Sequence, residues 1–340
     1  MATDGPTLSA VADLAGVSVS TASQVYSGRR PVAKQTRRRV LEAAAELGFH
    51  PDRGAPAVGI VIRPSEAITG FVFGTATFSN LAGAVAVACL NRGWSVFTAR
   101  GAADVLGQVP RLDGCVVLYP DVGDETLGLL TRRGVPAVSL DPDPGTGSFH
   151  WWSGADYRVA MTRLLEHLTE QGARRIALLV GQTDNAYRRS LLWTYSAAVT
   201  RRGQAPIFRV ADNAEGQLSA VAVAEDLLRR PNPPDAVVTS SSVFAAGTYT
   251  AAQRVGIGVP DDLMIATATD GPIAEMSQPS ITGLRIDITA AAHRLVDLLA
   301  QRMGDRSGPP AHRLLQLDLV VRESTRRCSE RGPEVAADPV

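Results

Sequence analysis

The apolar positions of the first fifty residues follow the period of an α-helix in three short segments. From Leu8 they recur at spacings of three and four until Gly16 interrupts them, which predicts a first helix that ends in a tight turn. Ser18 then supplies a good N-cap for a second helix over residues 19–26. A third helix is predicted over residues 34–47.

Each predicted helix has an apolar face that can pack against the other two. In the second helix this face consists of Ala22 and Val25. The positions expected to face inward in the third helix are Val40, Leu41, Ala44 and Leu47. Residues 1–51 are therefore predicted to form a compact all-α headpiece.

The pattern changes after Pro51. Residues 52–57, with their proline and glycine, are predicted to be a short linker. Beyond it the apolar runs are AVGIVI, WSVFTA, GCVVLY, PAVSL, RRIALLV, DAVVTS and LMIATAT. Such runs, mostly separated by helical stretches, are typical of strands buried on both faces by crossover helices. Residues 58–326 are therefore predicted to be an α/β core with parallel, doubly wound sheets.

The number of these units predicts a core with two lobes. The chain is expected to cross between them near residue 156 and again over residues 281–287. A cleft between strand carboxyl ends is then the expected place for a small ligand. Residues 327–340 are predicted to be a disordered tail.

The net charge of the chain limits the ways in which it can bind nucleic acid. The chain has 340 residues, 20% of them charged, and a net charge of zero, which excludes nucleic-acid binding by bulk electrostatics. A local basic patch remains open. Residues 1–53 hold seven basic against five acidic side chains, and six of the basic ones lie between Arg29 and Arg39.

The sequence offers no chemistry that is typical of an enzyme. The three cysteines, Cys89, Cys115 and Cys328, lack metal-ligand spacing and are typical of reduced thiols in a cytoplasmic protein. The five histidines are dispersed, and no nucleophile elbow or phosphate loop is present. We therefore expect no catalytic activity, no cofactor and no metal. Without a leader or a long apolar stretch, we also expect neither export nor membrane insertion.

Two helices joined by a glycine turn, the second beginning at a serine cap, form the helix-turn-helix pattern whose second helix enters the major groove of DNA. The exposed residues of that helix would be Val19, Ser20, Ser23, Gln24 and Ser27. On this pattern alone, a plain helical hairpin is an equal alternative.

The segment TLSAVADLAGVSVSTASQVYSGRRPVAKQTRRRVLEAAAELGFHPDR closely resembles the headpiece of LacI-family transcriptional regulators. The stretches LEHLTEQGARRIALLVG, VGIGVPDDLMIATATD, SQPSITGLRID and LDLVVREST are similar to that family's regulatory core. Over residues 7–326 the resemblance implies a periplasmic-binding-protein-like core and a DNA-binding regulator in the cytoplasm. It also implies a homodimeric repressor, or occasionally an activator, that binds a double-stranded DNA operator, with an unknown small-molecule effector in the cleft.

Gln24 departs from the family pattern VSxxTVSRVLNG, in which an arginine at this place commonly contacts guanine. Glutamine matches the N6 and N7 edge of adenine, so we hypothesise a changed base preference. The alternative is that Gln24 touches only phosphate or water. The residues expected to contact DNA are Ser18, Val19, Ser20, Thr21, Ser23, Gln24, Ser27, Arg29, Arg30 and Arg37.

Two further departures concern the linker and the cleft. Where the family has a short hinge helix with leucines that enter the minor groove, this chain has only DRGAPA, which disfavours a helix and predicts little bending of the operator. Family acidic and amide residues are replaced by hydroxyls at Ser241 and Thr269, which argues against an ordinary sugar effector. The residues expected to line the cleft are Arg189, Trp152, Ser241, Thr269 and Asp270. The altered linker and cleft leave open a regulator that acts without a ligand or through a protein partner.

Overall fold

The computed structural model divides the chain into two units, Met1–Pro56 and Ala57–Val340. The residues that it describes are 7–27, 32–47, 49, 55–63, 76–108, 112–145, 147, 149–305 and 311–326. Within them, no helix combines the length and the apolar character that crossing a membrane requires. The tail over residues 327–340 and most of the linker lie outside the described residues. Ala55 and Pro56 are not helical, and the first strand begins at Ala57.

The first unit is a headpiece of three helices, α1 (Leu8–Ala15), α2 (Val19–Ser27) and α3 (Lys34–Glu46). Thr7 caps the start of α1 by accepting the amide of Ala10 at 3.2 Å. Gly16 ends α1 in the left-handed region at φ 63°, where glycine avoids the strain of a side chain.

The three helices pack through small apolar side chains. Ala22 and Val25 of α2 are buried, as the sequence predicts, together with Val11, Ala12, Ala15, Val40, Ala43 and Ala44 of the neighbouring helices. The prediction for Leu41 is wrong, because its side chain is 44% exposed. Leu41 lies about 100° around the helix from Val40, whereas Ala43 and Ala44 follow at the spacing of the inward stripe.

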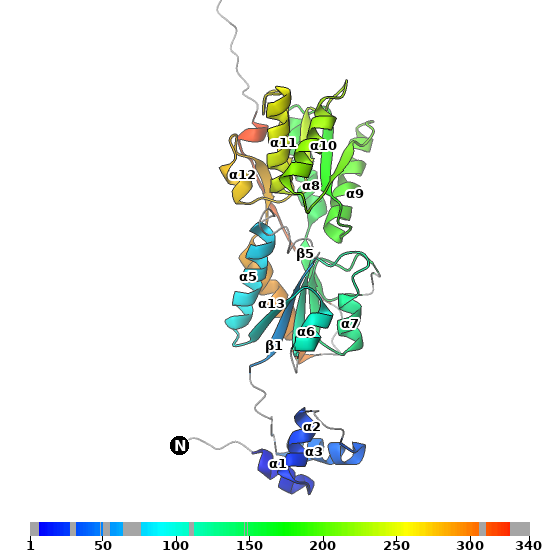
Figure 1. Ribbon diagram of the computed structural model, residues 1–340, viewed down its shortest axis with the longest axis vertical. Coiled ribbons are helices and arrows are strands. Elements are labelled where there is room, and N and C mark those ends of the chain that lie inside the picture. The colour runs from blue at the N-terminus through cyan, green and yellow to red at the C-terminus, as the bar shows by residue number, and fades with distance from the viewer. Residues whose placement is uncertain are drawn as a thin grey trace, which may run out of the picture. The chain divides into compact units, whose positions relative to one another are not determined.

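The second unit begins with a six-stranded lobe, which we call lobe 1. Its strand order is β11-β5-β4-β3-β1-β2, and every adjacent pair is parallel. The strands are β1 (Ala57–Ile62), β2 (Ser95–Ala99), β3 (Gly114–Leu118), β4 (Ala137–Leu140), β5 (Trp152–Ala155) and β11 (His312–Leu315). Helices α5 (Ala76–Leu90) and α13 (Ile288–Gly304) pack on one face, and α6 (Ala102–Gln108) and α7 (Thr126–Arg132) on the other (Figure 1).

Lobe 2 repeats this plan with the strand order β12-β10-β9-β8-β6-β7. The strands are β6 (Ile176–Gly181), β7 (Phe208–Ala211), β8 (Ala236–Thr239), β9 (Met264–Thr267), β10 (Thr282–Arg285) and β12 (Asp318–Val320), of which only β12 is antiparallel. Helices α8 (Tyr157–Glu170) and α9 (Ala186–Arg201) cover one face. The other face carries α10 (Gln217–Leu228), α11 (Ser242–Val255) and α12 (Pro272–Met276), and a 3-10 turn over Glu323–Thr325 follows β12.

The chain passes between the lobes three times. One passage lies between β5 and α8 at Asp156, whose carboxylate caps α8 by accepting the amide of Val159 at 3.1 Å. A second lies between β10 and α13, and a third between β11 and β12. The sequence analysis missed the third passage because β11 and β12 are short and mostly exposed, and therefore lack the apolar runs of buried strands.

The fold-class prediction is confirmed, with a helical headpiece followed by a two-lobed α/β core whose sheets are mainly parallel. His167 of α8 is half-buried, and its Nε2 lies 2.8 Å from the Thr325 hydroxyl. Cys89 and Cys115 are buried, and burial raises the pKa of their thiols to about 11 and about 12. Cys328 lies outside the described residues.

One substitution in the headpiece tests the account of its helix ends. Ala33 is the N-cap of α3 and makes no side-chain capping bond, so Ala33→Ser should stabilise the headpiece by about 1 kcal/mol. Hydrogen exchange of α3 amides in the full-length protein measures the effect. Ala45→Ser, at an exposed interior position of the same helix, is the control and should not increase protection. Equal protection in both variants would contradict the capping argument.

Candidate nucleic-acid interface and interlobe cavity

Three hydroxyl groups gather at the start of α2. The Ser18 hydroxyl accepts the amide of Thr21 at 3.1 Å and lies 2.8 Å from the Thr21 hydroxyl and 3.0 Å from that of Ser20. Ser18 and Ser20 are exposed. Hydroxyls and unpaired amides at a helix N-terminus are suited to phosphate oxygens, so this end of α2 can position the headpiece on a DNA backbone.

The outward face of α2 carries the candidate reading residues. Because Ala22 and Val25 point into the headpiece core, Val19, Ser20 and Ser23 are left exposed, and Gln24 is half-buried. This face is uncharged. It offers hydrogen bonds and a methyl surface to base edges rather than a strong field.

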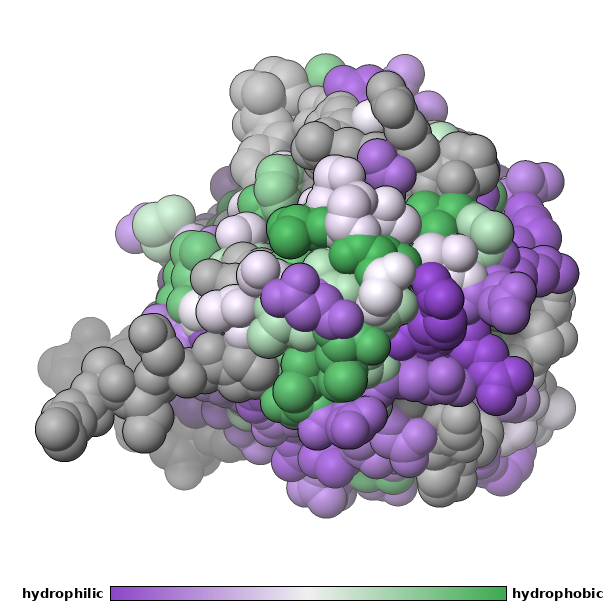
Figure 2. Space-filling view, turned by 90° about the horizontal axis from the view of Figure 1, so that it is seen from below, coloured by the Kyte–Doolittle hydropathy of each residue, from purple (hydrophilic) through white to green (hydrophobic). Residues whose placement is uncertain are grey.

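Apolar side chains also reach the surface of the headpiece, since Leu14 and Val19 are 48% and 47% exposed. The space-filling view in Figure 2 shows hydrophobic, weakly polar and strongly hydrophilic residues intermixed on one face of the molecule. Among the basic candidates, Arg37 is exposed near the start of α3. Arg29 and Arg30, and the side chain of Ser27, lie outside the described residues.

The core contains a small cavity of about 80 Å³ between the lobes. Most of its lining comes from the carboxyl ends of strands and the first turns of helices in lobe 2, whereas lobe 1 contributes Tyr119, and Ile286 and Leu317 lie on passages between the lobes. The lining residues are Tyr119, Tyr157, Asn185, Tyr187, Ser240, Ser241, Ala268, Thr269, Leu284, Ile286 and Leu317. Two of the five cleft candidates, Ser241 and Thr269, are therefore at this cavity.

Trp152 does not line the cavity. Its ring stacks on that of His312, with centroids 4.9 Å apart and planes at 17°, because the two residues are register partners on β5 and β11. The neighbouring Trp151 does not line the cavity either. Its side chain is buried in lobe 1, and the Arg302 guanidinium lies 4.9 Å from its ring centroid.

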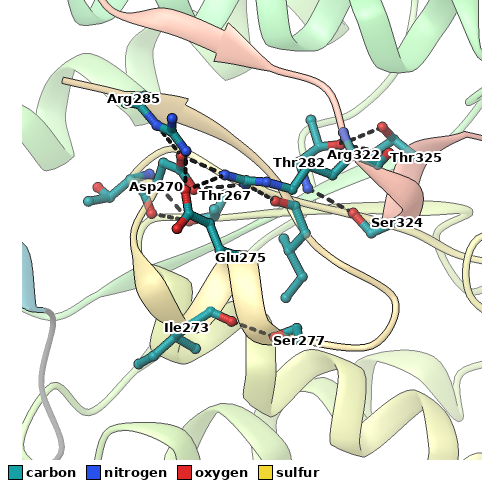
Figure 3. A network of polar contacts seen from close by, with 12 residues as sticks. Thr267, Asp270, Ile273, Glu275, Ser277, Thr282, Arg285, Arg322, Ser324 and Thr325 are labelled. Carbon is teal, nitrogen blue, oxygen red and sulfur yellow. Dashed lines mark hydrogen bonds and ion pairs between the residues drawn. The ribbon is translucent and has the colours of Figure 1, made fainter. Parts of the chain in front are cut away.

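Asp270 is likewise absent from the lining, because two arginines hold it within lobe 2. Arg322 donates to both of its oxygens at 2.8 and 2.9 Å, and Arg285 adds a bond of 2.8 Å. Figure 3 shows both guanidinium groups directed at this carboxylate, with Glu275 beside them. Burial acts to raise the pKa of Asp270, but the arginine hydrogen bonds outweigh burial and lower it. This network joins β9, β10, α12 and the segment after β12.

Arg189, the last of the five candidates, belongs to a contact between the lobes. It donates to both oxygens of Asp184 at 2.8 and 2.9 Å, and it donates to the carbonyl of Pro144 in lobe 1 at 2.7 Å. Next to it, the amide of Val122 donates to the Asp184 carbonyl at 2.9 Å, and Asp121 forms a β-bridge with Asn185. We call this set of direct contacts the interlobe clasp.

Arg63, at the end of β1, fixes the lobe 1 side of the clasp. Its guanidinium lies 3.3 Å from the carboxylate of Asp121 and 3.1 Å from that of Asp124, whose side chain is only 6% exposed. A partly buried arginine between two carboxylates holds the loop after β3 in place.

The sequence analysis missed the group with the most unusual environment, which is Asp141 with the tyrosines around it. Asp141 follows β4 and is 2% exposed, and its Oδ2 accepts the Tyr157 hydroxyl at 2.9 Å. Gly154 leaves room for it, because a Cβ there would lie 2.5 Å from Asp141 Oδ1. The sequence could have indicated Asp141, because it is a polar residue directly after a buried strand. It could not have indicated the surrounding tyrosines, because they lie far apart in the sequence.

The chemistry of Asp141 follows from its burial. Removal from water raises its pKa to about 7, although the hydrogen bond from Tyr157 and the backbone at Ala155 act in the opposite direction. Asp141 and Tyr119 also have positive φ angles of 69° and 55°. Backbone strain of this kind is often found at binding sites.

The complete architecture defines a class of protein, namely a two-lobed ligand-binding-type core that follows a helix-turn-helix headpiece. Residues 7–52 match the model of the bacterial regulatory proteins of the lacI family, and residues 165–325 match that of a periplasmic binding protein-like domain. The headpiece is therefore a LacI-family DNA-binding region, and the chain is a DNA-binding transcriptional regulator that is similar to members of that family over nearly its whole length.

Similar proteins extend over nearly the whole chain. The HTH-type transcriptional regulator CelR of Thermobifida fusca is 27% identical over 337 residues, which cover 94% of this chain and 98% of CelR. The ribose operon repressor of Escherichia coli K12 is 27% identical over 323 residues, covering 87% and 93% of the two chains.

Solved structures agree with this fold. The structure of a CelR–cellobiose complex has a TM-score of 0.71 and 27% identity, covering 94% of this chain and 99% of that one. The lac repressor dimer bound to operator and the anti-inducer ONPF has a TM-score of 0.69 at 22% identity, covering 95% and 99% of the two chains.

The buried carboxylate makes a prediction about pH. Since the pKa of Asp141 in the folded protein, about 7, exceeds its ordinary value of 3.8, its contribution to stability is complete below pH 4 and is lost as the pH rises to about 7. Asp141→Asn removes this dependence. The unfolding free energy of the variant relative to wild type should therefore rise by roughly 4 kcal/mol between pH 4 and pH 8.

Urea denaturation followed by tryptophan fluorescence measures this difference, because all four tryptophans lie in the second unit. Asp143→Asn, two residues away, is the control for loss of a carboxylate in the same loop. Parallel stability curves for Asp141→Asn and wild type would count against a raised pKa.

Proposed function

We propose that this protein is a cytoplasmic repressor that binds a double-stranded DNA operator as a homodimer and responds to a small molecule in the interlobe cavity. The observation that carries the proposal is the uncharged outer face of α2, with hydroxyls gathered at its N-terminus. These groups fit phosphate positioning and base-edge reading in a major groove. Relatives named as repressors, and a related structure with bound cellobiose, support repression and an effector.

The direct test is footprinting on the DNA that flanks the gene for this protein. The proposal expects protection of a site with two half-sites related by two-fold symmetry, since a homodimer presents two headpieces. Transcription from the protected promoter should rise when the protein is removed. Absence of any protected site would contradict the proposal.

Gln24 gives a prediction about sequence preference. Its amide can pair with the N6 and N7 edge of adenine, whereas arginine pairs with guanine, so Gln24→Arg should change one position of each half-site from adenine toward guanine. The discrimination should amount to about 1–3 kcal/mol. Selection from a random DNA pool measures it, with Gln35→Arg on exposed α3 as a matched control. Identical preferences for wild type and Gln24→Arg would exclude base reading by this residue.

The short linker gives a prediction about DNA shape. Between Pro51 and β1 the sequence has no leucine that could enter the minor groove, and Gly54 and Pro56 disfavour a helix. We expect little bending of the operator and weak coupling between the cavity and the headpiece. Gel mobility of circularly permuted operator fragments tests the first point. A strong dependence of mobility on site position would contradict it.

A second candidate function, regulation without a small molecule, is favoured by the interlobe clasp. Backbone bonds from Val122 and at Asp121, together with the Arg189 bond to Pro144, join the lobes directly and need no ligand as a bridge. Operator binding that no metabolite alters would favour this candidate. A compound that both stabilises the core and changes operator affinity would favour the first.

A further inference from the structure

Asp141 is a buried carboxylate without a positive partner. The carboxylate accepts the Tyr157 hydroxyl through Oδ2 and is stabilised by the backbone at Ala155, but Oδ1 has no hydrogen-bond partner of good geometry. No ion pair reaches Asp141 among the described residues, in contrast to Asp270, which two arginines neutralise. A buried carboxylate is normally paired with a positively charged group. The negative charge of Asp141 lacks such compensation.

The cavity beside Asp141 is aromatic and contains no charge. Tyr119, Tyr157 and Tyr187 line it, and no lysine, arginine or histidine is among the lining residues. The rings of Tyr157 and Tyr187 meet edge to face, with centroids 4.9 Å apart and planes at 65°. Both hydroxyls donate, to Asp141 and to the Ser240 carbonyl, which increases the electron density of the rings. Electron-rich rings at an angle to each other are suited to holding a cation.

The polar side chains that line the cavity already form hydrogen bonds with other groups of the protein. Asn185 caps α9 and Ser241 caps α11, each accepting an amide three residues later. The Thr269 hydroxyl bonds the Tyr187 hydroxyl at 2.9 Å and the Ser240 carbonyl at 3.2 Å. Few donors and acceptors remain for a polyhydroxylated ligand. The volume of about 80 Å³ also lies well below the roughly 300 Å³ at which pockets for drug-sized ligands begin.

We propose that the effector carries a small organic cation, an alkylated ammonium group, which enters this cavity against the tyrosine rings and is neutralised by Asp141. This inference rests on the proposed function and names the ligand class of its cavity. Asp141 acts through the Tyr157 hydroxyl rather than by touching the ligand, because it is not part of the lining. The ring faces supply the direct contacts.

Thermal unfolding of the full-length protein tests the proposal with tetramethylammonium chloride and choline chloride as probes. Sodium chloride at equal ionic strength controls for screening, and tert-butanol and 3,3-dimethylbutanol are the uncharged counterparts of the probes. At a probe concentration about ten times Kd, Tm should rise by about 3 °C with the cations and remain unchanged with the alcohols.

Two variants identify the groups responsible. Asp141→Asn should abolish the shift, and Tyr157→Phe, which keeps the ring but removes the bond to Asp141, should reduce it. Asp143→Asn, the matched control, should retain the full shift. Each variant is compared with itself in the absence of probe, so a change in its own stability does not affect the result. An equal shift with the alcohols, a full shift in Asp141→Asn, or no shift with either cation would overturn the proposal.

Footprinting on the same samples separates this proposal from the proposed function. If the protein protects an operator but shows no Tm shift with ammonium compounds, the proposal of a cationic ligand is wrong and the proposed DNA-binding function stands. An ammonium-specific Tm shift in a protein that protects no operator would support the cation site and contradict the proposed function.

Discussion

Parallel pairing of the strands is the constraint on which the core depends. It places the carboxyl ends of neighbouring strands at one edge of each sheet, and three passages of the chain hold these two edges opposite each other. The cavity, the Asp141 environment and the interlobe clasp are all built from residues that follow those strand ends. The Asp270 network does not connect the lobes. It joins the end of β9 to β10 and α12 within lobe 2.

The clasp and the cavity have opposite consequences for regulation. Direct bonds between the lobes stabilise the observed arrangement of the core without a ligand, whereas the buried charge of Asp141 destabilises it until a proton or a cation neutralises that charge. A ligand can change operator affinity only by the difference in its affinity for two states of the core. A small cation that removes the cost of Asp141 supplies such a difference, and it does so without the many polar groups that a sugar requires.

The sequence predicted the parts of the fold that repeat or that have caps. Buried strands such as Ala57–Ile62 and Gly114–Leu118 stand out as apolar runs, and the turn at Gly16 and the cap at Ser18 delimit the first two headpiece helices. Edge strands such as β7 and β11 were missed because half-exposed strands have no apolar run. In the cavity, Ser241 and Thr269 could be found by position within strand-end motifs. Trp152, Arg189 and Asp270 could not be placed, because their partners, His312, Pro144 and Arg322, are distant in sequence.

The claim that the lobes hold each other without a ligand can be tested by one distance measurement. Spin labels at exposed positions 133 and 201, one in each lobe, can be introduced after Cys328→Ser, because Cys89 and Cys115 are buried with raised pKa values and react poorly. Electron–electron resonance on the ligand-free protein should give one narrow distance distribution, and Arg189→Ala, which removes a bond of the clasp, should broaden it. A broad distribution in the ligand-free protein that Arg189→Ala leaves unchanged would contradict this account.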